Sequence, residues 1–266
     1  MSRRLFSILG AIAAATALPL TPADSHAQAG APTAPSRSAS AREAAPLDLT
    51  GYWVTLVYED WRFLMVTPPP GDFDSVPLTP EGRKVASLWK GPEADEAAGT
   101  QCKPYGAAAI MRMPGRIHVT WRDNNTLKID KDHGEQTRLL HFGGRAKAGG
   151  TRTWQGTSAA SWEEHRPPGP STTRSGWLQV VTTGMRAGYL RKNGVPYSEN
   201  AVVTEYFDAR REPGGFEWLV VTTVVEDPLY LTQPFITSTN YRSEPDGSKW
   251  SPLPCKTLPP PTPRQP

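Results

Sequence analysis

Cysteine is scarce in this chain, which contains only Cys102 and Cys255. They form no CxxC spacing, so neither a zinc site nor a thioredoxin-like redox motif is indicated. In an oxidising compartment we expect them to form one disulfide that ties the C-terminal end to the first third of the folded part. Net charge is also small, +3 at pH 7, without a dense Lys/Arg run, so there is no electrostatic case for nucleic-acid binding.

Several sequence signatures of enzymes are missing. There is no phosphate loop and no dinucleotide-binding fingerprint. The segment Gly156-Thr157-Ser158-Ala159-Ala160 lacks the second glycine of the G-x-S-x-G nucleophile elbow, which excludes a serine hydrolase of that type. The histidines, among them His118, His133 and His141, show no metal-ligand spacing, so no metal site is expected and any cofactor is left open.

Long apolar runs are limited to residues 5–20, which contain Gly10 and Pro19 and fall short of the roughly 20 strongly apolar residues of a spanning helix. Arg3 and Arg4 precede this run, and Ala27-Gln28-Ala29 follows it as a cleavage pattern. Residues 1–29 are therefore predicted to be a signal peptide. We expect a periplasmic or secreted protein without a membrane span, exported by the ordinary secretory route or, since Ser2-Arg3-Arg4-Leu5-Phe6 resembles the twin-arginine motif, by that route.

Composition divides the remainder of the chain into three parts. Residues 30–46 are rich in Ala, Pro and Ser and predict a flexible leader. Residues 47–255 are expected to form a single β-rich domain. Residues 256–266, with Pro259-Pro260-Pro261, predict an extended or disordered tail.

Short segments of alternating polarity dominate the predicted domain. Nearly all are rich in Val, Thr, Ile, Trp and Tyr, as strands prefer, and they lie at 52–58, 116–131 (a hairpin), 137–142, 152–157, 160–164, 177–183, 201–208, 216–225 and 235–242. Only residues 79–89 predict a helix, with Thr79 as cap and Pro80 at the first position. The fold class is therefore all-β and mainly antiparallel, a lipocalin-like barrel or a β-sandwich with one short helix.

Two resemblances add to this interpretation. Gly51-Tyr52-Trp53 resembles the G-x-W motif of lipocalin-like barrels. In that family the Trp closes the barrel base and stacks on an Arg near the last strand, a role that the resemblance gives to Arg242. A broader resemblance is to an uncharacterised family of exported bacterial β-rich proteins. It rests on residues 48–53, 154–158 with Trp162-Glu163, 203–205 and 226–234, and it implies export and a β fold but no catalytic residue.

Glu205 is the first candidate for chemistry. Period two places it with Val203 and Phe207 on the face of its strand that we expect to be buried. A carboxylate in an apolar site has a raised pKa unless it is paired, and such a group can serve as a general acid or base. The alternative is a structural ion pair with an arginine such as Arg138.

Two further residues complete the catalytic candidates. His118 alternates with Ile117 and Val119, so it would line a cavity if those two pack outward, or lie in solvent. Asp60 follows Glu59 in a charged connection between strands, where acidic residues can form a pair across a barrel mouth.

Nine tryptophans favour an aromatic-lined pocket, because aromatic side chains offer apolar area with a polar edge. The leading hypothesis is an exported barrel-like module that binds a small, partly apolar ligand, with Trp61, Trp121, Arg138 and Tyr230 as ligand-binding residues. The alternatives are a carboxylate-based hydrolase, hydratase or isomerase using Glu205, His118 and Asp60, and a cell-envelope scaffold or partner-binding protein. The oligomeric state is left open.

Overall fold

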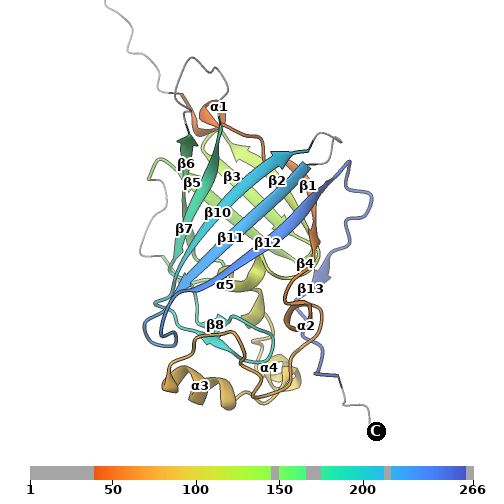
Figure 1. Cartoon of the computed structure of the whole chain (residues 1–266), viewed down its shortest axis with the longest axis vertical. Helices are drawn as coiled ribbons and strands as arrows, with labels where there is room; N and C mark the ends of the chain where they lie inside the picture. The colour runs from red at the N-terminus through yellow and green to blue at the C-terminus, as the bar shows by residue number, and fades with distance from the viewer. Residues whose placement is uncertain (1–38, 145–149, 166–174, 213–216, 262–266) are drawn as a thin grey trace, which may run out of the picture. The chain divides into compact units, whose positions relative to one another are not determined.

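A computed structural model describes residues 39–144, 150–165, 175–212 and 217–261. The predicted signal peptide and residues 30–38 of the predicted leader lie outside these ranges. The described chain is mostly β-strand, and its long strands close into one antiparallel barrel with a single parallel pair (Figure 1). The all-β prediction is thereby confirmed, as a barrel and not a sandwich.

Nine strands form the barrel and follow one another around it in chain order. They are β1 (Gly51–Leu56), β2 (Arg116–Asp123), β3 (Thr126–Lys131), β5 (Gln136–Phe142), β6 (Thr157–His165), β7 (Ser175–Thr183), β10 (Val202–Arg211), β11 (Glu217–Glu226) and β12 (Phe235–Glu244). Strand β12 pairs with β1 and closes the ring. Neighbouring strands are antiparallel except β5 and β6, which run parallel over Leu140–Phe142.

The period-two patterns place side chains alternately inside and outside the barrel. In β10, Val203, Glu205 and Phe207 are buried while the residues between them are partly exposed. The predicted hairpin forms as β2 and β3, and the carboxylate of Asp123 accepts a hydrogen bond from the backbone of Asn125 at the turn. For β10 the observed alternation buries the face that the sequence pattern predicts.

Short helices and two small sheets cover the ends of the barrel. Helix α1 (Ala41–Ala44) lies at one end, while α3 (Pro80–Ser87), α4 (Pro92–Ala97) and the pair β8 (Gly188–Tyr189) with β9 (Pro196–Tyr197) lie at the other (Figure 1). The remaining short elements are α2 (Trp61–Leu64), η1 (Lys103–Tyr105), α5 (Ala107–Ile110), and the parallel pair β4 (His133–Gly134) with β13 (Leu253–Pro254).

Helix α3 matches its prediction, since Thr79 accepts a hydrogen bond from Gly82 N and Pro80 occupies the first helical position. The other helices were not expected. Each has at most six residues, too few to show helical periodicity in the sequence. Ala86 of α3 and Ala107 and Ala108 of α5 belong to a second apolar cluster, which also includes Phe73, Leu78, Tyr197, Leu231 and Phe235.

Two expectations are wrong in detail. The predicted strand at 152–157 forms only one bridge, between Thr153 and Met185, and β6 begins at Thr157 because Gly156 turns the chain with φ of +60°. The Trp53–Arg242 stacking implied by the lipocalin resemblance does not form. Trp53 is buried and donates to Leu49 O, whereas Arg242 is exposed and pairs in register with Val54 on the other face.

Candidate functional site

Of the predicted site residues, the structure brings together Arg138 and Glu205. Arg138 Nη1 lies 2.8 Å from Glu205 Oε1, and Nη2 lies 2.5 Å from Oε2. The exposed fractions of the two side chains are 2% and 0%. Arg138 Nη2 also donates a hydrogen bond to Thr182 Oγ1, and the hydroxyl groups of Thr182 and Ser158 are hydrogen-bonded to each other. Glu205 therefore has the arginine partner that the sequence offered as the structural alternative.

His118 lies on the outer face of β2, because Ile117 and Val119 on either side of it are buried inside. Its ring stacks on Tyr52 with centroids 4.0 Å apart, and Trp250 approaches both rings edge-on. Partial burial lowers the pKa of His118, against the opposing charge of Asp130. His118 therefore belongs to an external aromatic cluster and does not face Glu205.

Asp60 and Trp61 lie outside the barrel at the start of α2. Asp60 adopts a left-handed conformation with φ of 52°, and Trp61 is 61% exposed. Asp60 lines a cavity of about 270 Å³ together with Arg112, whose burial lowers its pKa to about 10. Glu205, His118 and Asp60 thus occupy three separate places, and the structure assembles no acid–base pair from them.

The remaining two predicted ligand-binding residues contact other parts of the protein. Trp121 packs on Phe142, which packs on Trp162, in an aromatic row beside a cavity of about 390 Å³. Trp162 Nε1 donates to Ala41 O in α1, so the row supports the end of the barrel. Tyr230 lies in the turn after β11, where its backbone carbonyl accepts from Thr79 N and holds the start of α3.

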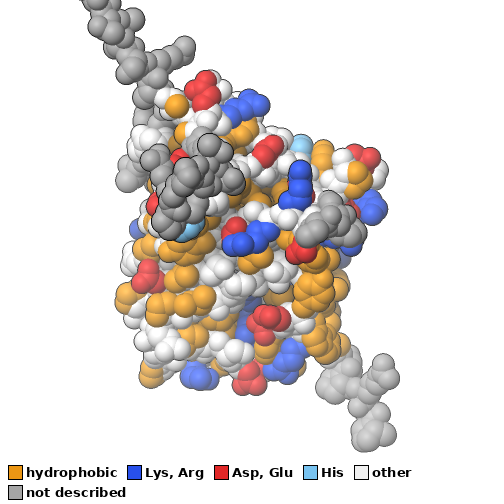
Figure 2. Space-filling model, turned by 45° about the horizontal axis from the view of Figure 1, so that its top comes forward, with side chains coloured by type: hydrophobic (Ala, Val, Ile, Leu, Met, Phe, Trp, Pro, Cys, Tyr) orange, Lys and Arg blue, Asp and Glu red, His pale blue; other side chains and the backbone are white. Residues whose placement is uncertain are grey.

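A larger groove, of about 560 Å³, lies between α2, β4 and the C-terminal segment. Its buried lining includes Thr67, Tyr105 and Met113. Met65 and Val66 after α2, and Leu253 and Leu258 near the C-terminus, line it with exposed apolar side chains. Figure 2 shows hydrophobic side chains gathered along the right-hand flank of the molecule. The groove thus combines a buried floor with apolar walls, as small-molecule sites do.

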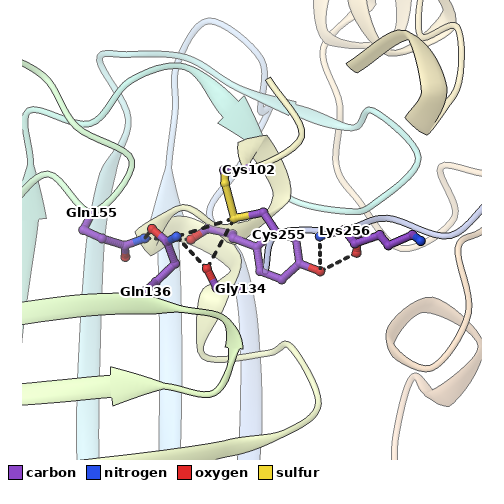
Figure 3. Close-up of a disulfide and its surroundings, with 7 residues drawn as sticks. Cys102, Gly134, Gln136, Gln155, Cys255 and Lys256 are labelled. Atoms are coloured by element: carbon purple, nitrogen blue, oxygen red, sulfur yellow. Dashed lines mark hydrogen bonds between the residues drawn. A yellow bond between two sulfur atoms is a disulfide. The ribbon is translucent and has the colours of Figure 1, made fainter. Parts of the chain in front are cut away.

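The Cys102–Cys255 disulfide attaches one wall of this groove to the rest of the protein, which confirms the predicted bond. Around it, Gln136 Nε2 donates to Gly134 O and approaches Cys255 Sγ, while Tyr105 donates to Lys256 O at 2.5 Å (Figure 3). Thr67 donates to Leu258 O at 2.5 Å. Lys256 and Leu258, in the segment expected to be an extended or disordered tail, are therefore held by hydrogen bonds to Tyr105 and Thr67.

The ionisable side chains of His, Lys, Asp and Glu type that line the groove, among the described residues, are all basic. Among the described residues that line it, His133, Lys192 and Lys256 carry basic groups and none is Asp or Glu. Lys192 Nζ donates to Leu64 O at 2.8 Å, and burial lowers the pKa of this lysine. An apolar site with this lining can hold a molecule with an apolar body and a negative group.

Sequence reasoning missed every residue of the groove. Its lining comes from five parts of the chain: residues 64–67, 105–114, 133, 192 and 253–261. The only local signal is an apolar-basic pattern before the prolines, formed by Leu253, Lys256 and Leu258. No group of three or more potential metal ligands occurs in the part of the chain that the structure describes. No helix within the described ranges is long and apolar enough to span a membrane.

Comparison with family models finds no match, and the comparisons with curated proteins and with solved structures find none either.

Proposed function

We propose that this protein is an exported β-barrel protein that binds a small, partly apolar molecule in the groove between α2, β4 and residues 253–261. The observation that carries the proposal is the groove itself. Its volume of about 560 Å³ falls within the ~300–1,000 Å³ typical of ligand sites, and most of its lining is apolar. A molecule bound there would cover Met65, Val66, Leu253 and Leu258, which otherwise expose apolar surface to water.

The barrel interior is a weaker candidate than the groove. Side chains from several strands fill it, including Trp53, Phe207, Tyr241 and the Arg138–Glu205 pair, all of which are buried. The tryptophans expected to line the pocket lie elsewhere. Among the described residues that line the groove, Tyr105 is present and no tryptophan is. The proposal therefore keeps the expected class of ligand and moves its site.

Export is part of the proposal and rests on two observations. Residues 1–29 carry the features of a signal peptide, and the Cys102–Cys255 bond is of the kind that persists in an oxidising compartment. Both support a periplasmic or secreted location.

The two alternatives are less well supported. None of the described residues that line the groove carries a carboxylate for acid–base catalysis, and Glu205, His118 and Asp60 lie apart. A flat apolar patch would favour a partner-binding surface, but here Thr67, Tyr105 and Met113 form a buried floor beneath the exposed walls. A concave site of this size favours a small molecule.

The proposal is tested with N-phenyl-1-naphthylamine, a neutral dye whose fluorescence rises on transfer from water to an apolar site. We expect saturable binding to the disulfide-intact protein and clear weakening in Leu258→Asp. The matched control is Leu88→Asp, because Leu88 is 67% exposed against 64% for Leu258 and does not line the groove. Absence of dye binding, or equal binding by both variants, would reject the groove as the site.

A further inference from the structure

The basic groups at the groove lack acidic partners. No ion pair joins Lys192 or Lys256 to a carboxylate in the described ranges of the chain, whereas Arg62 and Arg116 each have one. Lys192 is part-buried, and its one hydrogen bond is to a backbone carbonyl, which does not neutralise the ammonium charge. An ammonium without a counter-ion beside apolar side chains favours binding of an anion.

A third lysine lies behind the floor of the groove. Lys131 is buried, and its Nζ donates at 2.6 Å to the carbonyl of Met113, whose side chain lines the groove. The adjacent carboxylate, Asp132, accepts hydrogen bonds from the backbone N–H groups of Arg116 and His133. The described lining of the groove itself therefore offers the ammonium groups of Lys192 and Lys256 and no carboxylate.

We infer that the ligand is a single-chain amphiphile with an anionic head group. Its alkyl chain lies along Met65, Val66 and Leu253, and its head group binds Lys192 and Lys256. This inference rests on the proposed function, which requires only an apolar ligand, and it adds the charge of that ligand. It commits to a monomeric amphiphile and not to the surface of a membrane, because the groove has a buried floor and a volume suited to one small molecule.

The test is displacement of N-phenyl-1-naphthylamine by three ligands with the same alkyl chain: dodecanoate, dodecanol and dodecyltrimethylammonium. We expect dodecanoate to displace the dye at about tenfold lower concentration than dodecanol, as one charge-assisted contact allows. The cationic ligand should be the weakest. Equal displacement by the acid and the alcohol would overturn the inference while leaving the proposed function standing, and failure of all three together with the dye would remove both.

Charge variants locate the head group. Lys256→Glu should weaken dodecanoate binding about tenfold and leave dodecanol binding unchanged. Lys90→Glu makes the same change in net charge at an exposed site that does not line the groove, and it should change neither. Equal losses in the two lysine variants would show a non-specific effect of net charge and overturn the assignment.

A membrane source is distinguished by sedimentation with phosphatidylglycerol vesicles. We expect the protein to remain in the supernatant at physiological salt. Co-sedimentation that Lys256→Glu abolishes, without binding of monomeric dodecanoate, would overturn the inference in favour of a membrane surface.

Discussion

Arg138 and Glu205 pair across the barrel interior, although their strands are not neighbours in the sheet. Arg138 belongs to β5 and Glu205 to β10, with β6 and β7 between them in the ring. Thr182 of β7 adds a third strand to the network through its hydroxyl group. A single polar cluster therefore joins β5 to β10, two strands that no backbone hydrogen bond connects.

Removing one member of this pair should be costly. Glu205→Gln leaves the buried guanidinium without a counter-charge, and breaking such a pair typically costs about 3–5 kcal/mol of unfolding free energy. The double variant Arg138→Met/Glu205→Leu should recover most of the loss, because it buries no charge. Urea unfolding of the single and double variants measures both effects.

The exposed pair Arg211–Glu217 supplies the control. Glu217→Gln should change the unfolding free energy by less than about 1 kcal/mol, as surface pairs do. A cost at Glu205 no larger than that would show that the buried pair does not hold the strands together.

Two buried tyrosines should respond oppositely to loss of the hydroxyl group. Tyr241 donates to Met111 O at 2.5 Å, so Tyr241→Phe leaves a buried carbonyl without its donor and should cost about 1–3 kcal/mol. The Tyr197 hydroxyl has no hydrogen-bond partner among the described residues. Tyr197→Phe should therefore be neutral or stabilising by about 1 kcal/mol. Thermal unfolding of the two variants compares them directly, and a larger loss at Tyr197 would contradict this account.

Stability should rise with pH above neutrality because of Lys131. Burial lowers the pKa of this lysine to about 7, from 10.5 in the unfolded chain. Between pH 7 and 9.5 the unfolded chain holds a proton at this site that the folded protein has lost, so the free energy of unfolding increases with pH. Below pH 7 both states are protonated and the dependence disappears.

Lys131→Met should remove this slope, while Lys128→Met, on the same strand but partly exposed, should retain it. Urea midpoints from pH 6.5 to 9.5 provide the measurement. A slope of equal size in Lys131→Met would assign the effect to other groups.

Loss of the disulfide should release the groove wall. Cys102 and Cys255 are 153 residues apart, and chain-entropy models assign such a bond up to about 5 kcal/mol. In Cys102→Ala/Cys255→Ala we expect a lower melting temperature, faster tryptic cleavage after Lys256 and weaker dye binding. Far-UV circular dichroism should remain close to that of the parent, since the ring of barrel strands does not include β13. An unchanged cleavage rate would mean that Tyr105 and Thr67 alone hold the segment.

Most of the barrel could be predicted from the sequence, because its strands carry local signals. The alternation in Val203-Thr204-Glu205-Tyr206-Phe207 fixed the buried face, and Asn124-Asn125 marked the hairpin turn. The Cys102–Cys255 bond followed from cysteine count and compartment. The pairing of Glu205 with Arg138 could be named as an alternative because few cations fall on buried faces.

The groove could not be predicted, because no single segment contains it. Met65 can be recognised as a groove residue only because Leu253 and Tyr105 line the same groove in the folded protein. The position of Leu253 depends on the disulfide and on the pairing of β4 with β13. The orientation of His118 could not be predicted for a related reason. Its strand pattern was correct, but the sequence did not show which of the two faces would be inside.

The parallel pair β5–β6 has a topological cause. Each antiparallel neighbour reverses strand direction, so a closed ring must contain an even number of reversals. A closed ring of nine strands has nine neighbouring pairs, which is an odd number, so at least one pair must be parallel. The parallel strands β5 and β6 pair only over Leu140–Phe142 of β5, whereas β10 and β11 pair along their whole length. The odd strand count thus gives the barrel a built-in weak line, and amide hydrogen exchange should begin there.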